Sequence, residues 1–130
     1  MIGIDTNVLV RYLAQDDATQ SARATRLIEK KCSTDAPGFI GNVVLVETVW
    51  VSESVYRATR EEVAEIVRRV LSIKQLAVEN SEVAWRALRS FESSRADFAD
   101  CLVNQTAIAG SERVVTFDRQ AAKCGMALLR

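Results

Sequence analysis

Residues 2–13, IGIDTNVLVRYL, contain the pattern from which the fold of this chain is predicted. The apolar residues 2–4 are expected to form a short strand, and the polar triplet Asp5-Thr6-Asn7 is expected to end it. The apolar residues that follow, within 8–13, recur at the spacing of a helix. This order of strand, aspartate and helix is typical of an α/β unit, and it places Asp5 at the carboxyl end of a strand.

The same alternation continues along the rest of the chain. Further strands are expected near residues 38–41, 76–78, 114–117 and 126–129, and helices near 17–31, 43–57, 59–71, 80–91, 97–109 and after 118. Residues that suit helix N-termini stand at Asp17, Asn42, Thr59, Asn80 or Ser81, Asp97 and Asp118. Short apolar strands between helices predict one domain, residues 1–130, of the α/β class. We expect a three-layer α/β/α sandwich with a short, mostly parallel central sheet.

The composition is close to the average of soluble globular proteins. A length of 130 residues and a mass of 14.4 kDa suit a single hydrophobic core. Hydrophobic residues make up 48% and charged residues 26%, which excludes a disordered chain and a collagen-like fibre. No apolar run approaches the roughly 20 residues that a membrane span needs. Residues 1–5 contain no basic segment and no cleavage site, so we expect no signal peptide and a cytoplasmic location.

The charged and reactive residues restrict the chemistry that this chain can perform. Basic and acidic residues number 17 each, so any contact with nucleic acid must come from a local basic patch. The three cysteines are widely spaced, which disfavours a disulfide framework and a zinc site. Histidine is absent, which excludes Ser-His and Cys-His triads and histidine metal ligands. Oxygen ligands would select a hard cation such as Mg²⁺ or Mn²⁺.

Two carboxylates in the first half of the chain are candidate ligands. Asp5 is either a helix N-cap or a metal ligand at the edge of the sheet, and taken alone it favours the cap. Helical spacing places Glu47 on one apolar face with Val43, Trp50 and Val51, and Trp50 is expected in the core. An ionised carboxylate on a buried apolar face is costly unless it is paired. Glu47 is therefore expected either in a buried ion pair or at a metal ion.

Three aspartates in the second half stand at the ends of predicted elements. Asp97 and Asp100 lie one turn apart at the start of a predicted helix, with Asn104 one turn further along. Asp97 is either the N-cap of this helix or a further ligand, with the cap slightly favoured. Asp100 is favoured as a ligand, because neighbouring carboxylates repel unless a cation or a donor stands between them. Asp118 follows an apolar strand and is either a cap or a ligand, with the Thr116 hydroxyl nearby. Together these carboxylates indicate a shared Mg²⁺, which would activate water and neutralise charge on a phosphoryl oxygen.

Four segments carry a resemblance to a known family. They are residues 4–9 (IDTNVL), 46–47 (VE), 97–103 (DFADCLV) and 115–118 (VTFD), in this order. The chain resembles the PIN-domain family over essentially its whole length, and in particular the VapC-type toxins of bacterial toxin–antitoxin pairs. The resemblance implies an α/β sandwich and a Mg²⁺- or Mn²⁺-dependent endoribonuclease, a hydrolase of RNA phosphodiester bonds. The alternative is an inactive PIN-like module that binds RNA or a protein.

The resemblance also implies a set of site residues and partners. The main acidic positions of the family match Asp5, Glu47, Asp100 and Asp118. Asp97 corresponds to an additional acid that some members have. Polar positions that often support the site match Thr6, Asn7 and Thr116. Family members form homodimers and are held inactive by a small antitoxin, which carries the DNA-binding function, so contact with DNA is expected only through the antitoxin.

Basic residues offer contacts to RNA. They are Arg11, Arg23, Arg26, Lys30 and Lys31 on the first two predicted helices, and Arg57, Arg60, Arg68 and Arg69 on the middle ones. Most are expected to be solvated, some in i,i+4 ion pairs, and one or two to bind phosphate.

Two other families whose members contain an aspartate after a strand fit this chain less well. A phosphatase with an aspartate nucleophile needs a second aspartate two residues later, where Asn7 stands. A receiver domain needs a lysine directly after a late strand, whereas Asp118 is followed by Arg119 and only later by Lys123.

Overall fold

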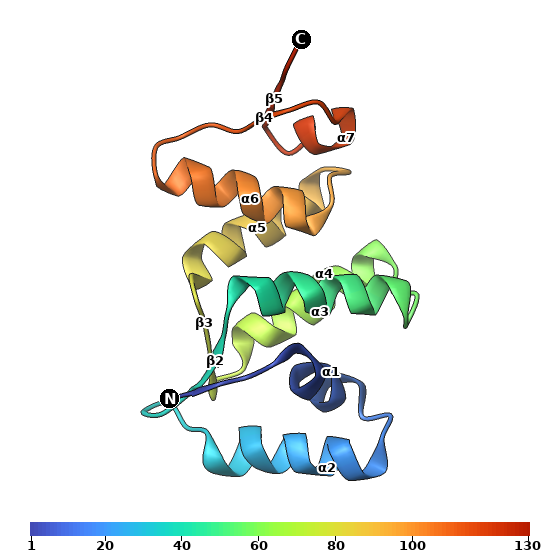
Figure 1. Ribbon diagram of the computed structural model, residues 1–130, viewed down its shortest axis with the longest axis vertical. Helices are drawn as coiled ribbons and strands as arrows, with labels where there is room; N and C mark the ends of the chain where they lie inside the picture. Colours follow the sequence, from blue (N-terminus) through green and yellow to red (C-terminus); the bar gives the residue numbers. More distant parts are fainter. The chain divides into compact units, whose positions relative to one another are not determined.

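The computed structural model describes all 130 residues. The chain packs into two compact units, which we call unit 1 (Met1–Glu79) and unit 2 (Asn80–Arg130). In each unit, helices alternate with short strands (Figure 1). No helix combines the length and the apolar character that crossing a membrane requires.

Unit 1 contains a parallel sheet of three strands. These are β1 (Ile2–Gly3), β2 (Gly38–Ile40) and β3 (Leu76–Val78), in the order β1-β2-β3. Gly38 allows the sheet to close, because a Cβ atom there would stand 2.9 Å from Cγ1 of Ile4. Strands β1 and β2 therefore pair closely up to the residue before Asp5.

The helices of unit 1 pack around this sheet and against one another. They are α1 (Thr6–Ala14), α2 (Ala18–Arg26), the π-helical turn η1 (Leu27–Lys31), α3 (Asn42–Ser54) and α4 (Arg60–Ser72). Helix α1 contacts α2 and α3, and α3 contacts α4. The predicted caps at Asp17 and Thr59 are confirmed, Thr59 forming a complete capping box with Glu62.

The predicted cap at Asn42 is wrong. Gly41 occupies the N-cap position of α3, and Asn42 is the first helical residue. The backbone N–H of Asn42 donates to Oε1 of Glu79, at 3.0 Å. Glu79, which is distant in sequence, thus accepts a backbone hydrogen bond at the N-terminus of α3 in place of a neighbouring cap residue. The local sequence does not reveal such a contact.

Unit 2 consists of two long helices and a small parallel sheet. The elements are α5 (Ser81–Ser93), α6 (Phe98–Ala109), β4 (Val115–Thr116), α7 (Arg119–Ala122) and β5 (Ala127–Leu128). Asn80, rather than Ser81, caps α5, and Gly110 ends α6 as predicted. Phe91 and Phe98 join α5 to α6 through an edge-to-face contact with ring centroids 6.1 Å apart.

The predicted α/β class is confirmed, and all five strands lie where the sequence placed them. The difference is that they form two parallel sheets, of three and two strands, one in each unit. Strands β4 and β5 have two residues each and pair with one another. That residues 1–130 form one domain stays a prediction.

Candidate active site

Three of the predicted site residues lie together in unit 1. Asp5 is the N-cap of α1, and its Oδ1 accepts the Thr6 amide at 2.8 Å. The Thr6 hydroxyl donates to Oε1 of Glu47, on α3, at 2.7 Å. The carboxylates of Asp5 and Glu47 are thus linked through one threonine, just beyond the carboxyl end of β1. The capping bond uses one oxygen of Asp5 and leaves Oδ2 for another ligand.

The predicted surroundings of Glu47 are wrong. Glu47 is exposed, and on the same face Val43 is 73% and Trp50 65% exposed. Helix α3 instead turns Leu45, Val49 and two polar residues inward. Those polar residues are Thr48 and Ser52, whose hydroxyls donate to the carbonyls four residues earlier at 2.7 Å. Because these local bonds satisfy the hydroxyls, the polar side of the helix can be buried and Trp50 lies outside the core.

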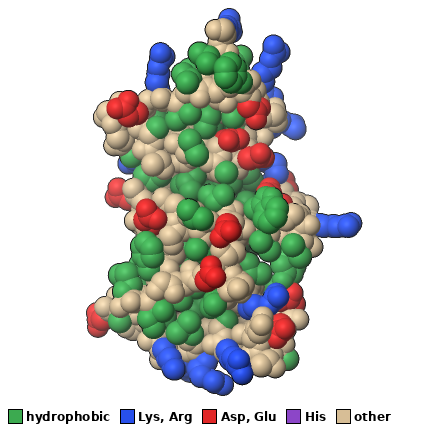
Figure 2. All heavy atoms as spheres, in the orientation of Figure 1, with side chains coloured by type: hydrophobic (Ala, Val, Ile, Leu, Met, Phe, Trp, Pro, Cys, Tyr) green, Lys and Arg blue, Asp and Glu red, His purple; other side chains and the backbone are tan.

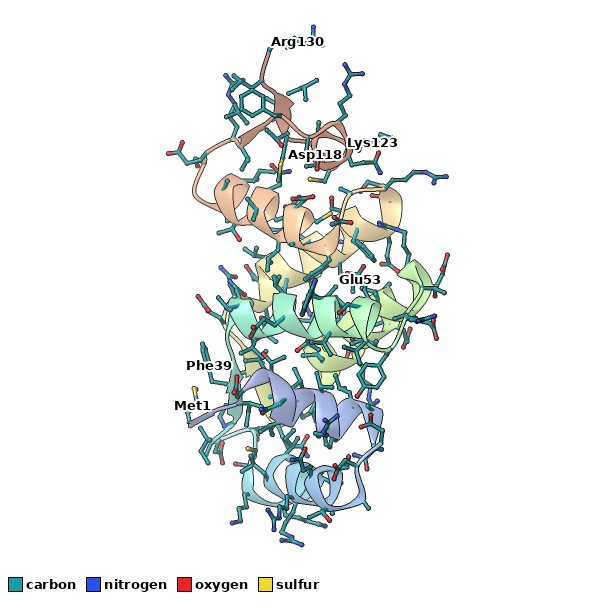
Figure 3. The ribbon with its side chains drawn as sticks, turned by 45° about the vertical axis from the view of Figure 1, so that its right-hand side comes forward. Met1, Phe39, Glu53, Asp118, Lys123 and Arg130 are labelled. Atoms are coloured by element: carbon teal, nitrogen blue, oxygen red, sulfur yellow. The ribbon has the colours of Figure 1, made fainter.

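Unit 2 contains the other three predicted acids. Asp97 is the N-cap residue of α6, as expected, but its side chain makes no capping hydrogen bond. Asp100 lies in the first turn of the same helix. Asp118 caps α7, since its Oδ1 accepts the Gln120 amide at 2.8 Å, and the Thr116 hydroxyl accepts the Asp118 amide at 3.0 Å. Figure 3 shows Asp118 where the chain enters α7.

The carboxylates of unit 2 stand close enough to affect one another. Partial burial raises the pKa of Asp100, and the negative charges of Asp97 and Asp118 raise that pKa further. All three causes act in the same direction, and no basic side chain is among them. A cation bound beside Asp100 would relieve this repulsion.

The side chains around Asp100 suit a hard cation rather than a thiophilic one. Burial raises the pKa of the neighbouring Cys101 thiol to about 11 and also raises the pKa of Cys124. Both therefore remain thiols at neutral pH and offer no thiolate ligand. No three acidic or cysteine side chains stand close enough together to hold a metal ion by themselves. Mg²⁺, however, commonly takes one or two carboxylates and fills its other positions with water, so the oxygen donors present fit it.

Asn7 and the basic residues lie beside the Asp5 group rather than in it. Asn7 is exposed and lines, with Arg11 and Arg23, a cavity of about 290 Å³ between α1 and α2. Arg11 is already held by other side chains, because its Nη1 donates to Asp16 at 3.3 Å and to the Tyr56 hydroxyl at 3.2 Å. Sequence reasoning missed this network because Tyr56 lies 40 residues after Asp16. Arg11 is thus a poorer phosphate ligand than it appears from the sequence.

Comparison with known proteins places these residues in a family. The PIN domain model matches residues 2–125, which includes all of the acids described above. The chain is 26% identical over 123 residues to a VapC ribonuclease of Aquifex aeolicus (strain VF5), covering 94% of this chain and 90% of that protein. The chain therefore belongs to the PIN-domain family, a family of nucleases, and within it is similar to a protein of the VapC type.

Proposed function

We propose that the chain is a Mg²⁺- or Mn²⁺-dependent endoribonuclease that acts as the toxin of a toxin–antitoxin pair. The observation that carries the proposal is the link through Thr6 between the carboxylates of Asp5 and Glu47, just beyond the carboxyl end of β1. Two carboxylates held in this way suit a bound Mg²⁺ that completes its coordination with water. The VapC ribonuclease to which the chain is similar supports RNA as the substrate.

The residues proposed as metal ligands, directly or through water, are Asp5 and Glu47 in unit 1, and Asp97, Asp100 and Asp118 in unit 2. When bound, Mg²⁺ supplies an activated water and stabilises negative charge on the phosphoryl oxygens. No imidazole is present to act as a base, and none is needed where a bound metal would lower the pKa of the attacking water.

Polar neighbours hold these carboxylates in place. The Thr6 hydroxyl fixes the Glu47 carboxylate, and Thr116 fixes the backbone of Asp118. The capping bonds of Asp5 and Asp118 fix Oδ1 of each side chain. In the proposed function these contacts prearrange the ligands before RNA binds.

The test is a cleavage assay on total cellular RNA with purified protein free of antitoxin, in Mg²⁺, Mn²⁺ and EDTA. Asp5→Asn is the key variant, because asparagine also caps helices well and should leave α1 intact. Asp35→Asn, at an exposed loop position, is the matched control. We expect metal-dependent fragments from the wild type and the control, and none from Asp5→Asn.

Normal cleavage by Asp5→Asn would refute the assigned site. Binding of RNA without metal-dependent cleavage by folded wild-type protein would instead indicate an inactive PIN-like binding module. The ends of any fragments would identify the RNA that is cut.

Partners follow from the same proposal. A toxin of this kind would act in the cytoplasm, be inhibited by a small antitoxin and contact DNA only through that antitoxin. The exposed apolar face of α3, which contains Val43 and Trp50, supports a protein interface, and we propose that it contributes to a homodimer.

A further inference from the structure

One buried amide joins the segment after α7 to helix α6. Asn104 is only 2% exposed, and its Nδ2 donates to the carbonyl oxygen of Cys124 at 3.0 Å. Twenty residues separate the two in sequence. A buried side-chain amide that bridges two elements is costly to remove, because its partner would be left without a hydrogen bond.

The bond has a defined relation to the aspartates. Asp100 and Asn104 lie four residues apart, so they occupy the same face of α6. Asp118 begins α7 and Cys124 follows its last turn, where the Cys124 amide donates to Ala121 at 3.2 Å. Asp118 stands at the start of α7, and Asn104 holds the segment just after its end. Asn104 thus ties the end of α7 to α6, and Figures 1 and 3 both show α7 beside α6.

The backbone after Cys124 is shaped to this contact. Gly125 has a φ of +116°, a conformation that other residues rarely adopt. A Cβ atom on Gly125 would stand 3.1 Å from Nδ2 of Asn104. The absence of a Cβ atom at Gly125 therefore leaves room for the side-chain amide of Asn104 beside this turn.

We propose that Asn104 is a positioning residue of the active site. Through Cys124 it holds the end of α7 to α6, and so sets where Asp118, at the start of α7, stands relative to Asp100 on α6. The inference rests on the proposed function, because the purpose of this arrangement is to present both carboxylates to one cation. Asn104 itself need not contact the metal.

The first test measures Mn²⁺ affinity of the full-length protein without RNA, from the free Mn²⁺ signal in electron paramagnetic resonance. Asn104→Ala should weaken binding about tenfold or more, as loss of a residue that orients metal ligands commonly does. Val83→Ala is the control, because Val83 is buried in α5 of the same unit and does not touch α7 through any hydrogen bond. Val83→Ala should bind Mn²⁺ within about twofold of wild type, even where it loses as much thermal stability as Asn104→Ala does.

The second test separates positioning from catalysis. In the cleavage assay, Asn104→Ala should need more Mg²⁺ for half-maximal rate but recover most of its maximal rate at high Mg²⁺. Asp100→Asn should not recover. Gly125→Ala strains the same contact but retains the Asn104 amide, so it should also raise the Mg²⁺ concentration needed for half-maximal rate. This variant replaces Asn104→Ala in the test if Asn104→Ala does not fold.

The outcomes distinguish this inference from the proposed function. If wild-type protein binds Mn²⁺ and cleaves RNA, but Asn104→Ala and Gly125→Ala match Val83→Ala in Mn²⁺ affinity, Asn104 has only a structural role and the inference is overturned. If wild-type protein neither binds Mn²⁺ nor cleaves RNA, the proposed function fails and the inference fails with it.

Discussion

At the scale of single residues, Asp100 shows a conflict between stability and the proposed chemistry. Partial burial and the charges of Asp97 and Asp118 raise its pKa, so its ionised form is less favourable in the folded chain than in the unfolded one. A raised pKa means that the folded state binds the proton more tightly. The stability that this contributes is present at acidic pH and is lost as the pH rises through the titration of the carboxyl.

Asp100→Asn should therefore abolish cleavage and, at pH 7, raise the free energy of unfolding. The gain should shrink as the pH falls below the titration range of Asp100, where the wild-type carboxyl is also neutral. Chemical denaturation at a series of pH values, without divalent cations, measures this. Asp35→Asn, on an exposed loop, should change stability by less than about 0.5 kcal/mol at every pH. A loss of stability at pH 7 in Asp100→Asn would contradict the argument.

At the scale of elements, α2 and η1 form a helix with two different sides. Ala24 and Ile28 are buried, whereas Arg23, Arg26 and Lys30 are exposed on the other side. Figure 2 shows basic side chains gathered at the end of unit 1 where Figure 1 places α2. Because the net charge of the chain is zero, such a local group is the form in which it can attract RNA.

Replacing Arg23, Arg26 and Lys30 with glutamine should weaken RNA binding and reduce its dependence on salt. Each lost phosphate contact to single-stranded RNA should lower the slope of log affinity against log salt by about 0.7. Fluorescence anisotropy with the Asp5→Asn background, which should not cut the probe, gives this slope. Arg86→Gln and Arg89→Gln, at exposed positions on α5, are the controls. If the slope is the same in both sets, α2 does not bind RNA.

The elements of this fold differ in how far the sequence predicts them. The strands, the Thr59 capping box and the end of α6 at Gly110 were predictable because their causes lie within a few residues. The usage of cysteine and histidine restricts the predicted metal ligands to oxygen donors, and this stays a prediction. The division into two sheets, the role of Glu79 at α3 and the exposure of Trp50 depend on contacts between distant segments. Periodicity alone assigned the wrong side of α3 to the core, because Thr48 and Ser52 satisfy their own hydroxyls.

At the scale of the whole molecule, the exposed apolar residues of α3 bear on assembly. Val43 and Trp50 lie on the same exposed side of this helix, next to Glu47. Exposed aromatic residues of this kind commonly contribute much of the binding energy of an interface. Since Trp50 is 65% exposed, its removal should affect assembly more than folding.

Trp50→Ser should weaken the proposed homodimer by about 2 kcal/mol while it changes the free energy of unfolding of the monomer by less than about 1 kcal/mol. Sedimentation equilibrium over a range of concentrations measures the first effect, and denaturation at low concentration the second. Val103→Ser, at an exposed apolar position of α6, is the control. An unchanged dimer constant in Trp50→Ser would mean that α3 is not part of the interface.

The π-helical turn η1 has a consequence for how this chain aligns with its relatives. Its last bond, from the Cys32 amide to the Leu27 carbonyl at 2.9 Å, spans five residues instead of four, so the turn contains one residue more than a regular helix. Both Ile28 and Cys32 are buried around it. Family members that lack one residue between positions 27 and 32 should therefore show a single gap there. In those proteins the helix should be regular, with the flanking strands unchanged.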